Sequence, residues 1–454
     1  MYANKRIIYL FAAAVIAWLP SGLKAQTSSI NAFSPYSMYG IGEINTPGTL
    51  QMRAMGGAGV ALRLPSSVNT LNPASYSSTL QRSFLFNFGV DGAYYKNHQN
   101  IYSADSQRYA KSGYGTFNFH EIAIQFPVTR GLGIGLSLTP YSSVGYRMKG
   151  YEEADEIWGD IGRVQYYYAG EGDLTEVKIG AGWEPFKHLS IGVAMQYYWG
   201  DIDRNYSTNV MNNFGDGTYS SIVGNENYSI SSVKGQVGLQ WEALSLSRHV
   251  LTFGATYDFG GDLRPQTTRT VYINNQLQIG VTNEVKRLQL RLPSQVTMGA
   301  NYQNPKLMVA FDYSYQNWGA RNTGSEIISD GFEVTYTDTH TVKFGAEYTP
   351  NLYDVRSYMR RVRYRAGFRY GDYYQAFQGH KIGQYAITFG LGFPIKFMGM
   401  SSVDIGFEYG SRGDRSMVTL DNKRLGLVRQ NYFKFSLGIS MFGDDYWFVR
   451  PKYD

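Results

Sequence analysis

The chain has 454 residues, no cysteine, a net charge of +6 and a mean hydropathy of −0.31. Without cysteine, a disulfide framework, a thiolate metal site and a lipid anchor on an acylated cysteine are all excluded. Lys and Arg are scattered among carboxylates, whereas a nucleic-acid-binding protein would cluster them on one element, so no nucleic-acid partner is expected. The 39 Tyr, 25 Phe and 51 Gly exceed ordinary soluble usage and indicate a special class of fold.

The first residues, MYANKRIIYLFAAAVIAWLPSGLKAQ, are typical of an export signal. Lys5 and Arg6 are cationic, residues 7–19 form an apolar run, and Ala25 supplies the small residue at a cleavage site. We expect residues 1–25 to be a signal peptide that is cleaved after Ala25. The alternative is an N-terminal membrane anchor, but the apolar run is short for a span of about 20 residues.

After residue 82 most of the chain alternates apolar with small or polar residues, which is the period of a β-strand. In SFLFNFGVDGAYY, for example, the phenylalanines share one face, and Asn87, Gly89 and Asp91 share the other. No later run of about 18 apolar residues occurs, so no helical membrane span is expected. Fourteen alternating segments can be counted, at residues 83–95, 115–128, 132–147, 173–185, 189–203, 227–243, 249–259, 288–303, 307–318, 333–348, 359–373, 384–397, 402–413 and 429–442.

The connections between these segments alternate in length. Odd-numbered segments are followed by long polar loops, such as residues 149–173, and even-numbered ones by tight links such as TRG and QNPK. An outer-membrane barrel has this asymmetry, with short periplasmic turns and long outer loops, and closure pairs every backbone group that lies in hydrocarbon. The sequence therefore predicts an all-β, 14-stranded antiparallel transmembrane β-barrel over residues 83–442, with residues 443–454 as a periplasmic tail. The location would be the outer membrane of a Gram-negative-type envelope, with outer-membrane lipid around the barrel.

Aromatic residues gather near the strand ends. Interfacial girdles at the two membrane surfaces would explain them, although aromatic residues are also good strand formers in general. We prefer the girdle for Trp and leave Tyr open. The residues are Tyr197, Tyr198, Trp199, Trp241, Trp318, Tyr373 and Tyr374.

Residues 26–82 precede the first strand and predict an N-terminal hatch or plug. A fourteen-stranded barrel has a lumen wider than its own side chains can fill, since barrels of about eight strands are just filled. Residues 52–77, MRAMGGAGVALRLPSSVNTLNPASYS, are apolar and glycine-rich, have no clean helical or strand period, and contain prolines that oppose strand pairing. GGAGV fails as a phosphate loop because no Lys-Ser/Thr follows. A disordered periplasmic tail is the alternative, and the apolar content argues against it.

At this point the sequence resembles a known family. RAMGGAGVA followed by NTLNPASYS is similar to the hatch signature of the FadL-type (FadL/TodX) outer-membrane transporters of hydrophobic compounds, of which this chain would be a divergent branch. Residues 292–318, LPSQVTMGANYQNPKLMVAFDYSYQNW, are similar to the family's mid-barrel hairpin, and residues 340–350, HTVKFGAEYTP, give a weaker match. The hatch and ligand-path candidates that the resemblance implies are Arg53, Met55, Gly56, Gly57, Gly59, Asn72, Pro73 and Ala74.

The segment RRVRYRAGFRYG places four arginines on one face of a strand. Cations that face lipid cost about 2–4 kcal/mol each at mid-bilayer, so this face is expected to be luminal. It could hold an acidic headgroup by bidentate hydrogen bonds. We prefer a structural network with the plug or with luminal carboxylates such as Glu176, Glu347, Asp404 or Glu408. The arginines are Arg361, Arg363, Arg365 and Arg369.

No enzyme is predicted. The six histidines include no pair at a metal-ligand spacing, and no G-x-S-x-G motif is present. We therefore expect no catalytic residue, no metal and no cofactor. The acidic residues 151–160, YEEADEIWGD, are interpreted as a solvated outer loop, with a calcium or lipopolysaccharide contact as the alternative.

Two functions remain open. The resemblance implies passive uptake of small hydrophobic, long-chain fatty acid-like molecules without chemistry, through an apolar pocket walled by Met52, Met55, Val60 and Leu62 and a lateral opening near Pro140. The family also includes non-transporting members that act with outer-membrane protein secretion and assembly machines. The second hypothesis is therefore a scaffold with envelope protein partners, which would bind through the long loops and residues 444–454.

Overall fold

The computed structural model describes residues 31–81, 83–102, 107–151, 163–211, 218–246, 248–263, 265–274, 276–282, 290–322, 326–327, 333–395, 401–420 and 423–444. The expected signal peptide, most of the acidic outer loop and nearly all of the expected periplasmic tail lie outside these residues. Within them no helix is both long and apolar enough to cross a membrane.

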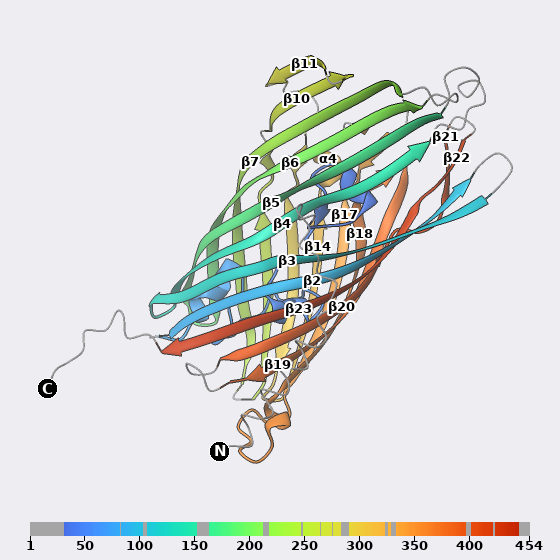
Figure 1. Ribbon diagram of the computed structural model, residues 1–454. Coiled ribbons are helices and arrows are strands. Elements are labelled where there is room, and N and C mark those ends of the chain that lie inside the picture. The colour runs from blue at the N-terminus through green and yellow to red at the C-terminus, as the bar shows by residue number, and fades with distance from the viewer. Residues whose placement is uncertain are drawn as a thin grey trace.

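Fourteen antiparallel strands close into a barrel (Figure 1). The ring closes where the first strand pairs with the last, from Ser83 opposite Asp444 to Gln99 opposite Val428. Each alternating segment of the sequence corresponds, in order, to one strand of the ring, so the predicted fold is confirmed. The strands are β2 (Ser83–Tyr102), β3 (Gln107–Thr129), β4 (Leu132–Tyr151), β5 (Arg163–Phe186), β6 (Leu189–Met211), β7 (Thr218–Ser245), β8 (Val250–Asp258), β13 (Gln295–Gln303), β14 (Leu307–Gln316), β17 (Thr339–Tyr348), β18 (Arg363–Phe377), β19 (His380–Pro394), β20 (Ser402–Arg412) and β23 (Val428–Asp444).

Alternate side chains along each strand face the lumen and the outer surface, as the alternating sequence pattern predicts. In β6, Ile191, Val193 and Met195 are exposed on the outer face, while Gly192 and Gln196 are buried inside. An apolar outer face and a small or polar inner face suit a wall between hydrocarbon and a filled lumen. The barrel therefore lies in the outer membrane.

Exposed aromatic side chains mark both ends of the apolar band. Trp183 and Trp241, each 52% exposed, lie near the ends of β5 and β7 that lead into short turns. Farther up the wall, Tyr197 and Trp199 stack with their ring centroids 5.6 Å apart. These residues have the placement of interfacial girdles.

The girdle interpretation is wrong for Trp318, and three of the tyrosines for which it was left open are buried as well. Trp318 is 0% exposed, because it follows the end of β14 in a short helix that folds inward. There its ring packs 4.6 Å from the ring of Tyr374. Tyr198 points inward because it occupies the opposite phase from its two neighbours in the strand. The buried aromatic residues are Tyr198, Trp318, Tyr373 and Tyr374.

Two connections differ from the predicted pattern. β18 runs to Phe377 and enters β19 at once, so the outer loop expected between the eleventh and twelfth strands is strand and turn. Gln378 and Gly379 both have positive φ, 50° and 76°, as tight hairpin turns require. At the opposite, periplasmic end, residues 349–362 form a longer connection that contains η3 (Tyr358–Arg361).

At the outer end, short elements between the strands fold over the opening or extend the sheet. β10 pairs with β7 above the barrel, and β11 pairs with β10 (Figure 1). Side chains beneath these elements form a buried cluster that includes Ile41, Tyr228 and Leu292. The elements are β9 (Gly261–Asp262), β10 (Gln266–Ile273), β11 (Gln276–Thr282), β12 (Arg291–Leu292), α4 (Trp318–Arg321), β15 (Glu326–Ile327), β16 (Glu333–Tyr336), β21 (Met417–Leu420) and β22 (Lys423–Gly426).

Residues 31–81, which we call the plug, lie inside the barrel and appear in blue in Figure 1. The plug contains four short elements and packs against strands from most of the ring. Its residues 46–63 are almost all buried. The elements are η1 (Pro35–Met38), β1 (Glu43–Ile44), α2 (Leu50–Arg53) and η2 (Pro73–Ser78).

An arginine placed on the outer face of the barrel tests whether that face contacts lipid. We expect Met195→Arg, in the middle of the lipid-facing band, to lower the unfolding free energy by about 2–4 kcal/mol in lipid bilayers. The matched change Val128→Arg, beside a short turn, should cost about 0–1 kcal/mol because the cation reaches the interface. Urea titration of both variants in vesicles measures the difference, and equal costs would contradict the proposed membrane band.

Candidate functional site

The plug meets the barrel wall at a row of four glycines, the glycine belt: Gly133, Gly182, Gly192 and Gly238. They lie directly opposite one another on β4, β5, β6 and β7. A Cβ added at Gly192 would lie 2.3 Å from the backbone nitrogen of Ala74, and one at Gly182 would lie 2.3 Å from the carbonyl oxygen of Pro73. Only glycine therefore allows η2 to rest backbone to backbone on the wall.

Asn72 fixes the start of η2. Its side-chain nitrogen donates to the carbonyl oxygens of Val60, at 2.9 Å, and Leu239, at 3.1 Å. Its side-chain oxygen accepts from the backbone nitrogen of Ala74 at 3.0 Å, which is the geometry of an N-cap. Pro73 follows as the first residue of η2, where its missing N–H costs no hydrogen bond. The Asn-Pro-Ala motif is thus a docking element.

The GGAG turn docks on the opposite wall. Gly56 has a φ of 71°, and its backbone nitrogen donates to Thr388 Oγ1 at 2.9 Å. Gly57 has a φ of 82°, a conformation that glycine adopts without steric cost. The backbone nitrogen of Gly59 donates to Asp312 Oδ2 at 2.7 Å. The plug therefore spans the lumen from β4–β7 to β14 and β19.

Met55 belongs to a packed cluster and not to an open pocket. It lies with Met52, Val60 and Leu62, and each of them is almost fully buried. The transport hypothesis expected these side chains to wall an apolar cavity. They pack on one another and on Leu71 and Met308 instead.

Arg53 anchors the plug to the first strand. Its Nη1 lies 2.6 Å from Asp91 Oδ2, and both side chains are largely buried. His120 of β3 is also near, with its Nδ1 3.6 Å from the same Asp91 oxygen. The Arg53 guanidinium thus compensates a carboxylate that the wall places inside the lumen.

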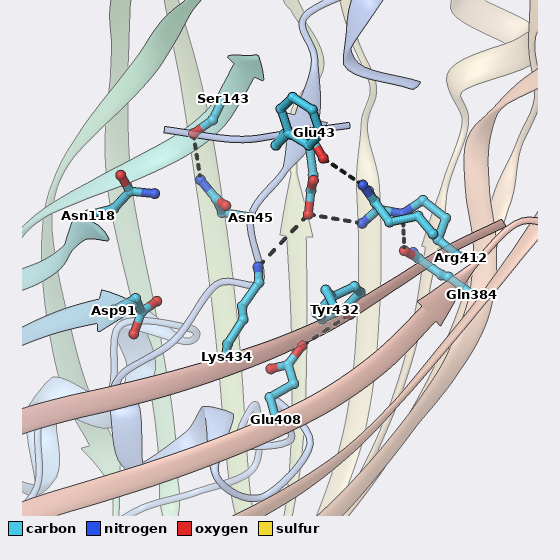
Figure 2. A network of polar contacts seen from close by, with 12 residues as sticks. Glu43, Asn45, Asp91, Asn118, Ser143, Gln384, Glu408, Arg412, Tyr432 and Lys434 are labelled. Atoms are coloured by element: carbon cyan, nitrogen blue, oxygen red, sulfur yellow. Dashed lines mark hydrogen bonds and ion pairs between the residues drawn. The ribbon is translucent and has the colours of Figure 1, made fainter. Parts of the chain in front are cut away.

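A second anchor, centred on Glu43 of β1, was missed by sequence reasoning. Glu43 Oε1 lies 3.2 Å from Arg412 Nη2 and 3.9 Å from Lys434 Nζ, two cations on β20 and β23 (Figure 2). Arg412 Nε also donates to Gln384 Oε1 at 3.3 Å. Glu43 is a single carboxylate in a segment without a regular pattern, so the sequence around it does not mark it. The only indication was that Arg412 and Lys434 occupy strand positions that face the lumen and need a carboxylate partner.

Arg365 and Arg369 enter a wall network with carboxylates named from the sequence. Arg365 bonds Glu347 and Asp404, each at 2.6 Å. Arg369 Nη2 lies 2.7 Å from Glu408 Oε1. Of the other two arginines of the predicted face, only Arg361 lies outside the strand. Arg361 ends η3 and stacks on Tyr358, 5.0 Å from the ring centroid, and Arg363 is half-buried at the start of β18.

The space left between plug and wall is small and has a mixed lining. Two cavities of about 110 Å³ each lie there. The ionisable side chains that line the first are His120, Glu176, Lys178, Lys234, Asp258 and Lys343, beside apolar ones such as Val60 and Leu71. Those lining the second include Glu43, Lys343, Arg369, Arg412 and Lys434. Neither cavity is therefore lined by apolar groups alone.

The wall itself has a seam between β3 and β4. Their pairing runs from Thr129 opposite Leu132 to Ile122 opposite Leu138 and stops there, two residues before Pro140. Beyond this point β1 of the plug pairs with β4, with Glu43 opposite Ser143 and Ile44 opposite Ser142. A cleft of about 590 Å³ opens above, between the outer parts of β2, β3 and β4. The lateral opening expected near Pro140 therefore coincides with a seam that the plug covers.

Among the described residues no group of three or more His, Asp or Glu side chains is placed to hold a metal ion. Many polar groups of the lumen take part in plug docking and wall pairing. What the fold and the site define is an outer-membrane β-barrel of the FadL type with a folded plug in its lumen.

The chain belongs to the BamG family, whose model matches residues 5–454. No curated protein sequence matches the chain. Among solved structures, a FadL homologue of Pseudomonas aeruginosa is 14% identical, with a TM-score of 0.60 and coverage of 88% of this chain and 99% of that one. The Pseudomonas putida toluene transporter TodX is 16% identical, with a TM-score of 0.53 and coverage of 89% and 99%. The Ralstonia pickettii toluene transporter TbuX is 15% identical, with a TM-score of 0.51 and coverage of 87% and 97%. At these identities the likeness establishes the fold.

A single methyl group tests the glycine belt. We expect Gly192→Ala to unseat η2, because its Cβ would overlap the backbone of Ala74, and to lower the unfolding free energy by about 1–3 kcal/mol. Trypsin should then cleave the plug at Arg53 or Arg63. The control is Gly383→Ala on β19, where an added Cβ meets nothing within 4 Å. Equal trypsin resistance of the two variants would contradict docking on the belt.

Two arginine substitutions on β18 test the assignment of the luminal ion-pair network. Arg365→Met leaves Glu347 and Asp404 buried without their cation, which should cost about 3–5 kcal/mol. Arg363→Met removes a half-buried guanidinium with no ion pair within 4 Å among the described residues, so we expect a cost below about 1 kcal/mol. Urea unfolding in micelles compares the two. If Arg363→Met proved the more destabilising, the assignment of the network would be wrong.

Proposed function

We propose that this barrel is a permanently plugged scaffold, a non-transporting subunit of an outer-membrane protein assembly or secretion machine. The observation that carries the proposal is the way the plug is held. It has a backbone contact on the glycine belt, a buried ion pair from Arg53 to Asp91, and a second ion pair from Glu43 to Arg412. A gate that opens would have to break contacts on opposite walls together.

The character of the lumen supports the same proposal. A path for hydrophobic molecules needs a continuous apolar lining, and charged side chains interrupt the lining of both cavities beside the plug. Met52, Met55, Val60 and Leu62 of the plug pack against one another and do not line an open pocket. The family name, BamG, hints at a role in such a machine. The proposal includes no chemical step and no cofactor.

Passive uptake of small hydrophobic molecules is the second candidate, and one observation favours it. The seam between β3 and β4 and the cleft of about 590 Å³ above it are placed where a ligand could enter sideways from the membrane. The similar solved structures include toluene transporters. Uptake by this route would require the plug strand β1 to leave β4.

A locking disulfide separates the two functions, because the chain has no native cysteine. Ile44 and Ser142 are directly paired across β1 and β4, at a separation that suits a disulfide. We expect the oxidised Ile44→Cys/Ser142→Cys variant to support growth and envelope assembly as well as the wild type does. The reduced double variant and the single Ile44→Cys variant are the matched controls.

Native mass spectrometry after mild detergent extraction provides the direct readout. For both the wild type and the locked variant, the scaffold proposal expects a larger assembly with other envelope proteins. A lone barrel that carries a lipid-sized ligand, together with hydrocarbon uptake that is lost on locking and restored on reduction, would overturn it in favour of transport.

A further inference from the structure

The periplasmic loop at residues 349–362 presents apolar side chains to solvent. Val355 is 96% exposed and Tyr353 81%, the highest values among the exposed large apolar residues of the described chain. Met359 and Tyr358 are exposed beside them. The loop, drawn in orange, projects below the strand ends at the bottom of Figure 1. Neighbouring exposed apolar side chains, as distinct from scattered single ones, are typical of an interaction site.

Hydrogen bonds within the loop hold its shape. Asp354 Oδ1 accepts from the backbone nitrogens of Ser357 and Arg356, each at 2.8 Å. These bonds from Ser357 and Arg356 lower the pKa of the Asp354 carboxyl below its ordinary value, so it stays ionised. Arg360 closes the turn, with its Nη1 3.2 Å from Asp354 Oδ2 and its carbonyl accepting from Asn351 N at 2.8 Å. Val355 is therefore displayed by a preorganised turn.

The base of the loop is tied to its neighbours at the barrel rim. Thr349 N donates to the carbonyl of Lys306 in the next turn, at 2.8 Å, and the Tyr358 hydroxyl donates to the carbonyl of Pro394 at 3.0 Å. The aromatic girdle at this end, with Trp183 and Trp241, lies on the strands themselves. The tip points away from the membrane beyond that girdle, so lipid is not the occupant that the geometry favours.

Charge identifies the chemistry of the occupant. The exposed charged residues of the described periplasmic turns are all cations. The one carboxylate of the loop, Asp354, is engaged by the backbone nitrogens of Arg356 and Ser357. An apolar tip with cations beside it complements an acidic partner. The exposed cations of the loop and of the turn hydrogen-bonded to it are Lys306, Arg356 and Arg360.

We propose that residues 349–362 are the docking site for a periplasmic protein segment that combines acidic and apolar side chains. This inference rests on the proposed scaffold function and deepens it. Val355 and Tyr353 insert into the partner, Arg356 and the surrounding cations pair with its carboxylates, and the rigid turn lowers the ordering cost of binding.

Site-specific photo-crosslinking in intact cells tests the docking site. A photoreactive amino acid replaces Val355 in one variant and Lys187, on a different turn, in the control. We expect a single protein adduct from position 355, attached within an acidic segment of the partner, and little adduct from position 187. A lipid adduct at 355, or a partner segment without acidic residues, would overturn the proposal.

Two substitutions give an independent readout in the gently extracted complex. Val355→Asp and Arg356→Glu should each weaken the complex about tenfold or more. Adding 0.5 M NaCl should weaken the wild-type complex relative to low salt, because it screens the cations of the loop. Tyr272→Asp, which alters an exposed side chain at the outer end, is the matched control. Each variant is first checked for a folded barrel by its heat-modifiable gel mobility.

The two proposals fail in different ways. If the wild-type protein is recovered without any partner, the scaffold function fails and the loop has nothing to dock. If the complex is present and survives both loop substitutions unchanged, the scaffold stands and residues 349–362 are not its docking site.

Discussion

The width of a fourteen-stranded lumen is the constraint on which the rest of this molecule depends. Side chains that point inward from such a ring cannot meet at its centre, so the chain must supply more material. It supplies backbone. The plug crosses the interior as an irregular segment. At several places where its backbone lies against the wall, the wall residue is a glycine, as at Gly192 against Ala74 and Gly367 against Gly56. The high glycine content of the chain is thus partly a property of the interface between plug and wall.

Electrostatics then decide whether such a plug can move. Inside the lumen several cations and carboxylates pair across elements, as in Arg53 with Asp91 and Glu43 with Arg412. Leaving a buried charge without its partner costs about 3–5 kcal/mol. A shift of a two-state equilibrium from 1:99 to 99:1 needs about 5.5 kcal/mol of differential binding. Separation of both pairs, with loss of the glycine-belt contacts, would therefore oppose movement of the plug.

The sequence predicted the ring well because its signal is local. Period 2 is visible within each segment, and a tight link such as residues 130–131 is a local event. The Asn-Pro-Ala motif was equally visible, since Asn72 caps its own neighbour Ala74. Two kinds of feature were harder to predict from the sequence: which side of the wall a given aromatic residue faces, and where the chain turns into the lumen after a strand ends. Tyr198 and Trp199 are adjacent and point to opposite sides, and Trp318 left the predicted girdle because the chain turns inward one residue after β14 ends.

Pairings inside the lumen were the least predictable, because they depend on register across several strands. Arg369 lies opposite Lys343 on one side and Ala386 on the other, so its carboxylate partner, Glu408, comes from a strand two positions away. The small side chain of Ala386 leaves the space that this contact needs. No pattern within one strand encodes that arrangement, and the four residues of the glycine belt share the same property.

The seam between β3 and β4 connects the two functions that this architecture can serve. An unpaired edge within a membrane is unfavourable, because its N–H and C=O groups have no partner in hydrocarbon. Here β1 pairs with this edge of β4, and two other plug residues extend the contact: Asn45 N donates to the carbonyl of Tyr141, and Ser34 N donates to that of Gly145. The strand that completes the wall is therefore the strand that carries Glu43, the charge that holds the plug. In this chain the same segment closes the seam and carries the charge that holds the plug, which is the coupling on which the proposed scaffold function depends.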